Sequence, residues 1–180
     1  MKTTLNKIRE HKPCADGWKK LLTYLGKTEA DDEPISLLTI LDSNDFDDAL
    51  WCLRAVEGYD KEIRLYAVWC ARQVQDLMTD KRSLVAIDVA ERYAHGQATD
   101  KELTTARAAA WDAANADMNA TALDVVSAAA RAAMATTWDA AWPAAWTAAN
   151  AATNATALSA WDAARDVQEK EFRRVLEKNA

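Results

Sequence analysis

Histidine and glycine are scarce in this chain, and their scarcity excludes the commonest catalytic and phosphate-binding arrangements. The two histidines, His11 and His95, lie in no pattern typical of a proton relay with a carboxylate or a cysteine. The four glycines are isolated from one another, so no glycine-rich loop is available to cradle a phosphate. The sequence therefore predicts no catalytic residue, no cofactor and a protein that is not an enzyme.

Cysteine is also rare, and its number argues against a disulfide framework. The chain has three cysteines, and no apolar run of the secretory kind occurs in its first residues. We expect reduced, buried thiols in the cytoplasm. His11 and Cys14 offer two zinc ligands, but structural zinc takes four, and Cys52 and Cys70 fall on apolar helix faces. No metal site is expected.

Basic charge is outnumbered by acidic charge. The chain has 22 Lys and Arg against 28 Asp and Glu, a net charge of -6. Binding to nucleic acid through phosphates requires a basic face, so we expect no nucleic-acid partner. Residues 140–161 carry no charge and are long enough to span a bilayer, but they are rich in alanine and include Pro143 and several polar side chains. We therefore expect no membrane association.

Alanine is present in large excess, with tryptophan placed among it at helical spacing. Residues 106–165 contain 28 alanines and no glycine, and their tryptophans are Trp111, Trp138, Trp142, Trp146 and Trp161. Alanine is the strongest helix former, and its small side chain lets helices approach closely. The fold class predicted is all-α, a multi-helix bundle of helical hairpins with an Ala/Trp-rich C-terminal half.

The alanine-rich half contains an internal repeat. Residues 109–123 match residues 144–158 at 12 of 15 positions, an offset of five heptads. A single helix through this half would be about 120 Å long, so the chain must turn back. Thr136-Thr137 is the favoured turn, and Pro143 prevents a regular helix through it. Turns at 119–121 and 154–156 would give four short helices instead of two long ones, and the sequence leaves both arrangements open.

The N-terminal half shows helix boundaries and a paired motif. Helices are predicted over 18–25, ended by Gly26, and from Pro34 onward. A further helix is predicted over 81–94, capped by Thr79 or Asp80 and ended by Gly96. Residues 48–54 and 66–72 share a Trp-Cys-x-Arg core and are predicted to be equivalent helices, the first capped by Ser43, with arginines that bond to nearby carboxylates or carbonyls. Thr99 and Glu102 have capping-box spacing, and a charged helix should close the chain with Val167, Phe172, Val175 and Leu176 inward. The predicted parts are residues 1–97 and 98–180, packed as one continuous domain.

Two groups of residues are candidates for binding a partner. The first is an acidic cluster, which could steer a basic partner or simply complement helix N-termini. The second is a tryptophan stripe at i, i+4 and i+8, which could be exposed or could pack against alanine in the core. The candidate residues are Asp31, Asp32, Glu33, Asp42, Asp45, Asp47 and Asp48 in the acidic cluster and Trp138, Trp142 and Trp146 in the stripe.

Five parts of the chain carry a resemblance: the Trp-Cys segments at 41–56 and 62–74, residues 88–93, the Trp-Asp-Ala-Ala array and Glu171-Phe-Arg-Arg174. Through these parts the chain resembles a family of immunity proteins. The resemblance covers most of residues 35–175. Members of that family occur in bacteria, phages and prophages and are associated by context with polymorphic toxin systems. It implies an all-helical, non-enzymatic protein that binds and neutralises another protein, and it supplies no binding residues.

Two main hypotheses follow. The first is a binding protein that neutralises a toxin or effector protein stoichiometrically, or that blunts a defence system if it is carried by a phage. The second is a structural module that self-assembles through its Ala/Trp face, so a homo-oligomer is possible. An enzyme, the least favoured hypothesis, would have to draw acid/base groups from Asp42 to Asp48 near Arg54 or Arg72.

Overall fold

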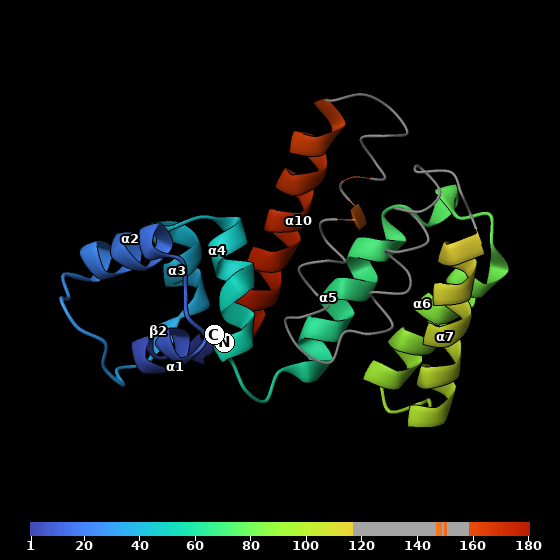
Figure 1. Cartoon of the computed structure of the whole chain (residues 1–180), viewed down its shortest axis with the longest axis horizontal. Coiled ribbons are helices and arrows are strands. Elements are labelled where there is room, and N and C mark those ends of the chain that lie inside the picture. Colours follow the sequence, from blue (N-terminus) through green and yellow to red (C-terminus); the bar gives the residue numbers. More distant parts are fainter. Residues whose placement is uncertain (117–146, 149, 151–158) are drawn as a thin grey trace. The chain divides into compact units, whose positions relative to one another are not determined.

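The computed structural model describes residues 1–116, 147–148, 150 and 159–180 (Figure 1). This part of the chain is helical apart from one pair of two-residue strands, which confirms the all-α fold class. None of its helices combines the length and the apolar character that crossing a bilayer requires. The residues form two compact units, Met1–Tyr59 with Phe172–Ala180, and Asp60–Glu171. The boundary predicted at residue 97 falls within the second unit.

The first unit contains short elements. They are β1 (Lys2–Thr3), α1 (Leu5–Glu10), α2 (Ala15–Leu25), β2 (Ile35–Ser36), α3 (Leu37–Ser43), α4 (Phe46–Trp51), the 3-10 helix η1 (Cys52–Ala55) and the end of α10 (Ser159–Lys178). Strands β1 and β2 are antiparallel, with Thr3 opposite Ile35, and the Thr3 hydroxyl donates to the Ala55 carbonyl at 2.5 Å. The amino group of Met1 donates to the carbonyl of Asn179, so both ends of the chain are fixed to this unit.

Large aliphatic and aromatic side chains fill the core of the first unit. Phe46 and Phe172 pack with their ring centroids 5.7 Å apart. The other fully buried members include Leu5, Ile8, Leu37, Ile40, Leu50, Leu53 and Leu176. Six or seven residues of helix are marginal alone in water, so this shared core stabilises the short helices.

Several predicted boundaries in the first unit are wrong. Helix α2 begins at Ala15, because the Cys14 sulfur accepts the Gly17 N–H at 3.3 Å, and α1 has no counterpart in the sequence prediction. Helix α3 does not begin at Pro34, because Ile35 pairs in the sheet and Ser36 caps the helix. Ser43 ends α3 rather than capping the next helix; Asp45 caps α4. The end of α2 at Gly26, with φ of 65°, is confirmed.

The two Trp-Cys motifs are not structural copies. Trp51 ends α4 and Cys52 begins the 3-10 turn, whereas Trp69 and Cys70 lie inside α5 (Asp60–Arg72). The first motif belongs to the first unit and the second motif to the second unit. Cys52 and Cys70 are buried as expected, but Cys14 is exposed. The three residues shared by the two motifs therefore do not imply a shared backbone conformation.

The described part of the second unit contains longer helices. They are α5, the 3-10 helix η2 (Gln75–Leu77), α6 (Lys81–Ala94), α7 (Asp100–Ala116) and the first part of α10. Helices α6 and α7 lie side by side (Figure 1). Asp80 caps α6 and Gly96 follows its end with φ of 71°, both as predicted. The capping box also forms: Glu102 N–H donates to Thr99 Oγ1 at 3.2 Å and Thr99 N–H to Glu102 Oε2 at 2.8 Å.

Helix α10 begins earlier than the predicted charged helix and turns one predicted core residue outward. Phe172 and Leu176 are buried as expected, but Val167 is 46% exposed. Tyr66 of α5 donates to the Gln168 carbonyl at 3.3 Å, which fixes α10 to α5. Three predicted features lie outside the described residues: the turn at Thr136-Thr137, the break at Pro143 and most of the internal repeat.

Candidate partner-binding surfaces

The first part of the acidic cluster surrounds a lysine. Lys27 Nζ lies 2.6 Å from Asp31 Oδ2 and 2.6 Å from Glu33 Oε2. The hydrogen bonds to Asp31 and Glu33 raise the pKa of Lys27, and the bond from Lys27 lowers the pKa of Asp31. Asp32 is exposed beside them. Two of these three carboxylates therefore hold the 27–33 segment in shape.

The second part of the cluster caps and braces short helices. Asp45 Oδ1 accepts the Asp48 N–H at 2.8 Å, at the N-terminus of α4. Asn44 Nδ2 donates to Asp48 Oδ2 at 2.8 Å and to the Gly17 carbonyl at 2.9 Å, which ties α4 to α2. Carboxylates near a helix N-terminus complement its dipole. Asp45 and Asp48 therefore stabilise the short helices of the first unit.

The last two members of the acidic cluster lie on exposed helix surface. Asp42 Oδ1 lies 2.8 Å from Arg173 Nη2, and Asp47 is exposed in the first turn of α4. The seven carboxylates thus spread over several local contacts instead of one concave surface. Among the residues that the structure describes, no three His, Cys, Asp or Glu side chains could together hold a metal ion. The tryptophan stripe, Trp138, Trp142 and Trp146, lies outside them.

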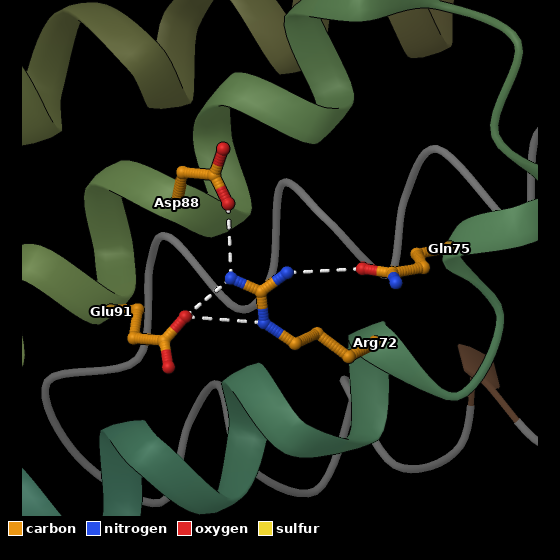
Figure 2. Close-up of polar contacts among 4 residues, drawn as sticks. All are labelled: Arg72, Gln75, Asp88 and Glu91. Carbon is orange, nitrogen blue, oxygen red and sulfur yellow. Dashed lines mark hydrogen bonds and ion pairs between the residues drawn. The ribbon is translucent and has the colours of Figure 1, made fainter.

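Figure 2 shows a polar cluster around Arg72 at the end of α5. Arg72 Nη2 donates to Asp88 Oδ1 at 2.9 Å and also to Glu91 Oε2, while Nε reaches Glu91 Oε2 at 3.2 Å. Arg72 Nη1 donates to Gln75 Oε1 at 3.0 Å. A guanidinium presents a rigid fork of donors, and here it joins α5, η2 and α6. The prediction that this arginine bonds to nearby carboxylates is confirmed.

The electrostatics of the Arg72 cluster identify it as a structural clamp. Partial burial alone would lower the pKa of the guanidinium, but the bonds to Glu91 and Asp88 outweigh it and raise the pKa. Both carboxylates are thus bonded to a guanidinium that stays charged, and the cluster holds α5 against α6. Arg54 differs from Arg72: its guanidinium lies 4.0 Å from the centroid of the Trp51 ring, a cation–π contact.

A small pocket in the first unit places two thiols near two indoles. It holds about 80 Å3 and is lined in part by Trp18, Trp51, Cys14 and Cys52. Sites for drug-sized ligands usually hold about 300–1,000 Å3, so this pocket is too small for them. Burial raises the pKa of Cys52 to about 12, which keeps its thiol protonated and unreactive near neutral pH.

A larger open groove of about 480 Å3 runs along α6 and α7 in the second unit. Its walls are formed by the side chains of Lys81, Arg82, Val85, Val89, Thr99, Lys101, Glu102, Thr105, Ala106 and Ala109. Val85, in the middle of the α6 wall, is 52% exposed, whereas Val89 is buried. We call this feature the α6–α7 groove. It is apolar along its length, and basic side chains stand at its ends.

Val85 and Val89 lie one helical turn apart on an apolar stripe of α6, but only Val89 is buried. Helix α6 is apolar over about half of its circumference, from Val85 through Val89 to Ile87, at 3.6 residues per turn. Packing against α5 and α7 covers Ala86, Ile87 and Ala90 but not Val85. The apolar arc of α6 is wider than the neighbouring helices can cover, and this width, visible in the sequence, could have revealed the groove.

No family model matches the chain, and no curated protein or solved structure is significantly similar to it. The resemblance to immunity proteins therefore depends on the residues quoted for it and stays a prediction.

Proposed function

We propose that this protein is a non-enzymatic binding protein that acts in the cytoplasm and neutralises a toxin or effector protein by occupying its surface. The observation that carries the proposal is the α6–α7 groove, which leaves a branched aliphatic side chain half exposed between two well-formed helices. A concave apolar surface with charged ends is typical of a protein–protein interface. The resemblance to immunity proteins supports the same class of function.

The polar clusters support binding rather than chemistry. The carboxylates bonded to Lys27, Asn44, Arg72 and Arg173 shape or brace the fold. Stoichiometric occlusion requires only a complementary surface, and the α6–α7 groove supports that role.

The test is to identify a partner and then to titrate it. The full chain, carrying an affinity tag, is used as bait in host cells that lack the untagged protein, and the recovered partner is purified separately. We expect the toxic or enzymatic activity of the partner to fall in proportion to added protein and to reach its minimum at one molar equivalent. Recovery of no specific partner at any salt concentration would contradict the proposal. Loss of activity at a small fraction of an equivalent would indicate an enzyme instead.

A self-assembling module is the alternative function, and one described residue favours it. Trp111 of α7 is 39% exposed at the start of the Ala/Trp-rich half. Static light scattering over a wide concentration range distinguishes the two proposals. A monomer whose mass does not change with concentration would remove self-assembly, whereas a defined oligomer that Trp111→Ala dissociates would favour it.

A further inference from the structure

We propose that the α6–α7 groove receives an α-helix of a partner protein that presents apolar side chains one turn apart and acidic side chains at both ends. This inference rests on the proposed function, because it names the chemistry of the partner that the binding protein takes. It starts from the exposure of Val85 and from the charges at the two ends of the groove.

The shape of the groove favours a helix over an extended peptide. Helices α6 and α7 satisfy their own backbone groups, so the groove has no strand edge on which a peptide could add as a β-strand. Two side-by-side helices instead form a channel into which the ridge of a third helix can pack. Lys81 and Val89 mark the extent of the α6 wall, and eight residues of helix correspond to about 12 Å, or two turns.

The α7 wall allows a close approach. Ala106 and Ala109, three residues apart, contribute only methyl groups to the groove, and Thr105 lies beside them. Residues three and four apart share one face of a helix, so these small side chains form a shallow depression opposite Val85. A leucine or isoleucine from a partner helix would fill that depression and cover Val85 at the same time.

The charges at the ends of the groove select an acidic partner. The lining contains three cationic side chains, Lys81, Arg82 and Lys101, and one carboxylate, Glu102, although the whole chain has a net charge of -6. Arg82 already pairs with Asp80, and Glu102 with Arg92. Within the described part of the chain, Lys81 and Lys101 form no ion pair, and they stand on the first turns of α6 and α7. Asp80 and Asp112 lie near Arg82, and Asp100 precedes Lys101, so Lys81 and Lys101 are the cations of the lining that remain for carboxylates of a partner.

The experiment uses the full chain and three synthetic peptides of about 16 residues, long enough to form helix. The peptides share one leucine face and differ only at their ends, which carry Glu, Gln or Lys. Fluorescence anisotropy of labelled peptide gives the dissociation constants. We expect the Glu-ended peptide to bind at least about tenfold more tightly than the Lys-ended one, and the difference to shrink as salt rises.

Two variants test which residues are responsible. Val85→Asp should weaken binding of the Glu-ended peptide by about tenfold or more, because it places a charge in the apolar middle of the groove. The matched control is Val167→Asp, an equally exposed valine on α10 outside the groove, which should leave the affinity unchanged. The double variant Lys81→Glu, Lys101→Glu should reverse the preference, so that the Lys-ended peptide binds more tightly.

Other outcomes would overturn the inference. Equal affinity for all three peptides, or unchanged affinity in Val85→Asp, would show that the groove does not select an acidic helix. A dimer that Val85→Asp dissociates would assign the groove to a second copy of the chain, and binding of dodecanoate in place of peptide would assign it to an anionic amphiphile. If a neutralised partner binds Val85→Asp as tightly as it binds the original chain, this inference fails and the proposed function stands. If the peptides behave as expected and no partner is neutralised, this inference stands and the proposed function fails.

Discussion

The two compact units differ in what fills their interiors and in what their helices leave exposed. Leucine, isoleucine and phenylalanine fill the first unit, whereas the helix contacts of the second depend heavily on alanine, at Ala67, Ala71, Ala86, Ala90 and Ala110. Six large apolar side chains of the described residues are exposed. One of them, Tyr24, belongs to the first unit, and the other five belong to the second: Leu77, Leu84, Val85, Trp111 and Val167.

This difference follows from side-chain size. An alanine interface brings helix backbones close together at little cost in side-chain entropy, but each methyl group removes little surface from water. Larger apolar residues that flank the contact are then left uncovered, as Val85 is beside Ala86. A core of large side chains interdigitates and covers its own flanks. The first unit thus covers nearly all of its large apolar side chains, whereas the described part of the second leaves several exposed.

The largest effect is expected from removing a large side chain from the first unit. Phe172→Ala deletes a ring that packs against Phe46, and a cavity of that size costs about 3–5 kcal/mol of the free energy of unfolding. Equilibrium unfolding in urea measures it. Val167→Ala on the same helix is the control and should cost much less, because Val167 is about half exposed. Equal losses in the two variants would contradict the account of this core.

The stability of the second unit should fall most when a buried alanine is enlarged, rather than when a side chain is shortened. Ala90→Leu adds three carbons where α6 is fully buried against its neighbours, and we expect a loss of about 1–3 kcal/mol from overpacking. Ala108→Leu, at an exposed position of α7, is the matched control and should change stability little. Urea unfolding again gives both values. If Ala90→Leu is neutral, the helices of the second unit are not in close contact at this position.

The Arg72 clamp tests whether polar contacts compensate for the small alanine side chains. Arg72→Met keeps the aliphatic stem but leaves Asp88 and Glu91 facing each other without a cation, and we expect a loss of about 1–2 kcal/mol. Arg72→Lys should recover only part of it, because an ammonium lacks the fork geometry. A double-mutant cycle with Glu91→Gln isolates the pair, and a coupling free energy near zero would show that the clamp is incidental.

The sequence predicted those elements whose signals are local. The capping box of Thr99 and Glu102 and the stop at Gly26 are decided by residues within one helical turn, and both are confirmed. Helix α1 and the pairing of Thr3 with Ile35 could not be predicted in the same way. The two strands are 32 residues apart and two residues long, so only the assembled core stabilises them.

The candidate site shows the same division between local and tertiary information. The acidic residues were visible as a charge cluster, but partners such as Arg173 for Asp42 come from distant parts of the sequence. The α6–α7 groove was hidden because periodicity marks which residues are apolar, not which of them a neighbouring helix covers. Val85 and Ala86 are adjacent in the sequence, and only the position of α7 makes one a wall of the groove and the other part of the core.

The smallest effect is expected on the stability of the N-terminus of α7 as the pH falls. The Thr99 N–H, the Arg92 guanidinium and the Thr99 hydroxyl all donate to Glu102, and together they lower its pKa from an ordinary 4.5 to about 2. A carboxylate with a lowered pKa in the folded state stabilises that state above its unfolded pKa, so this contribution is complete above about pH 4.5 and is lost as the pH falls toward 2. Glu102→Gln should therefore unfold more readily than the original chain at pH 6, and the difference between their melting temperatures should narrow by pH 2.5. A difference that is the same at both pH values would mean that the charge of Glu102 does not stabilise the start of α7.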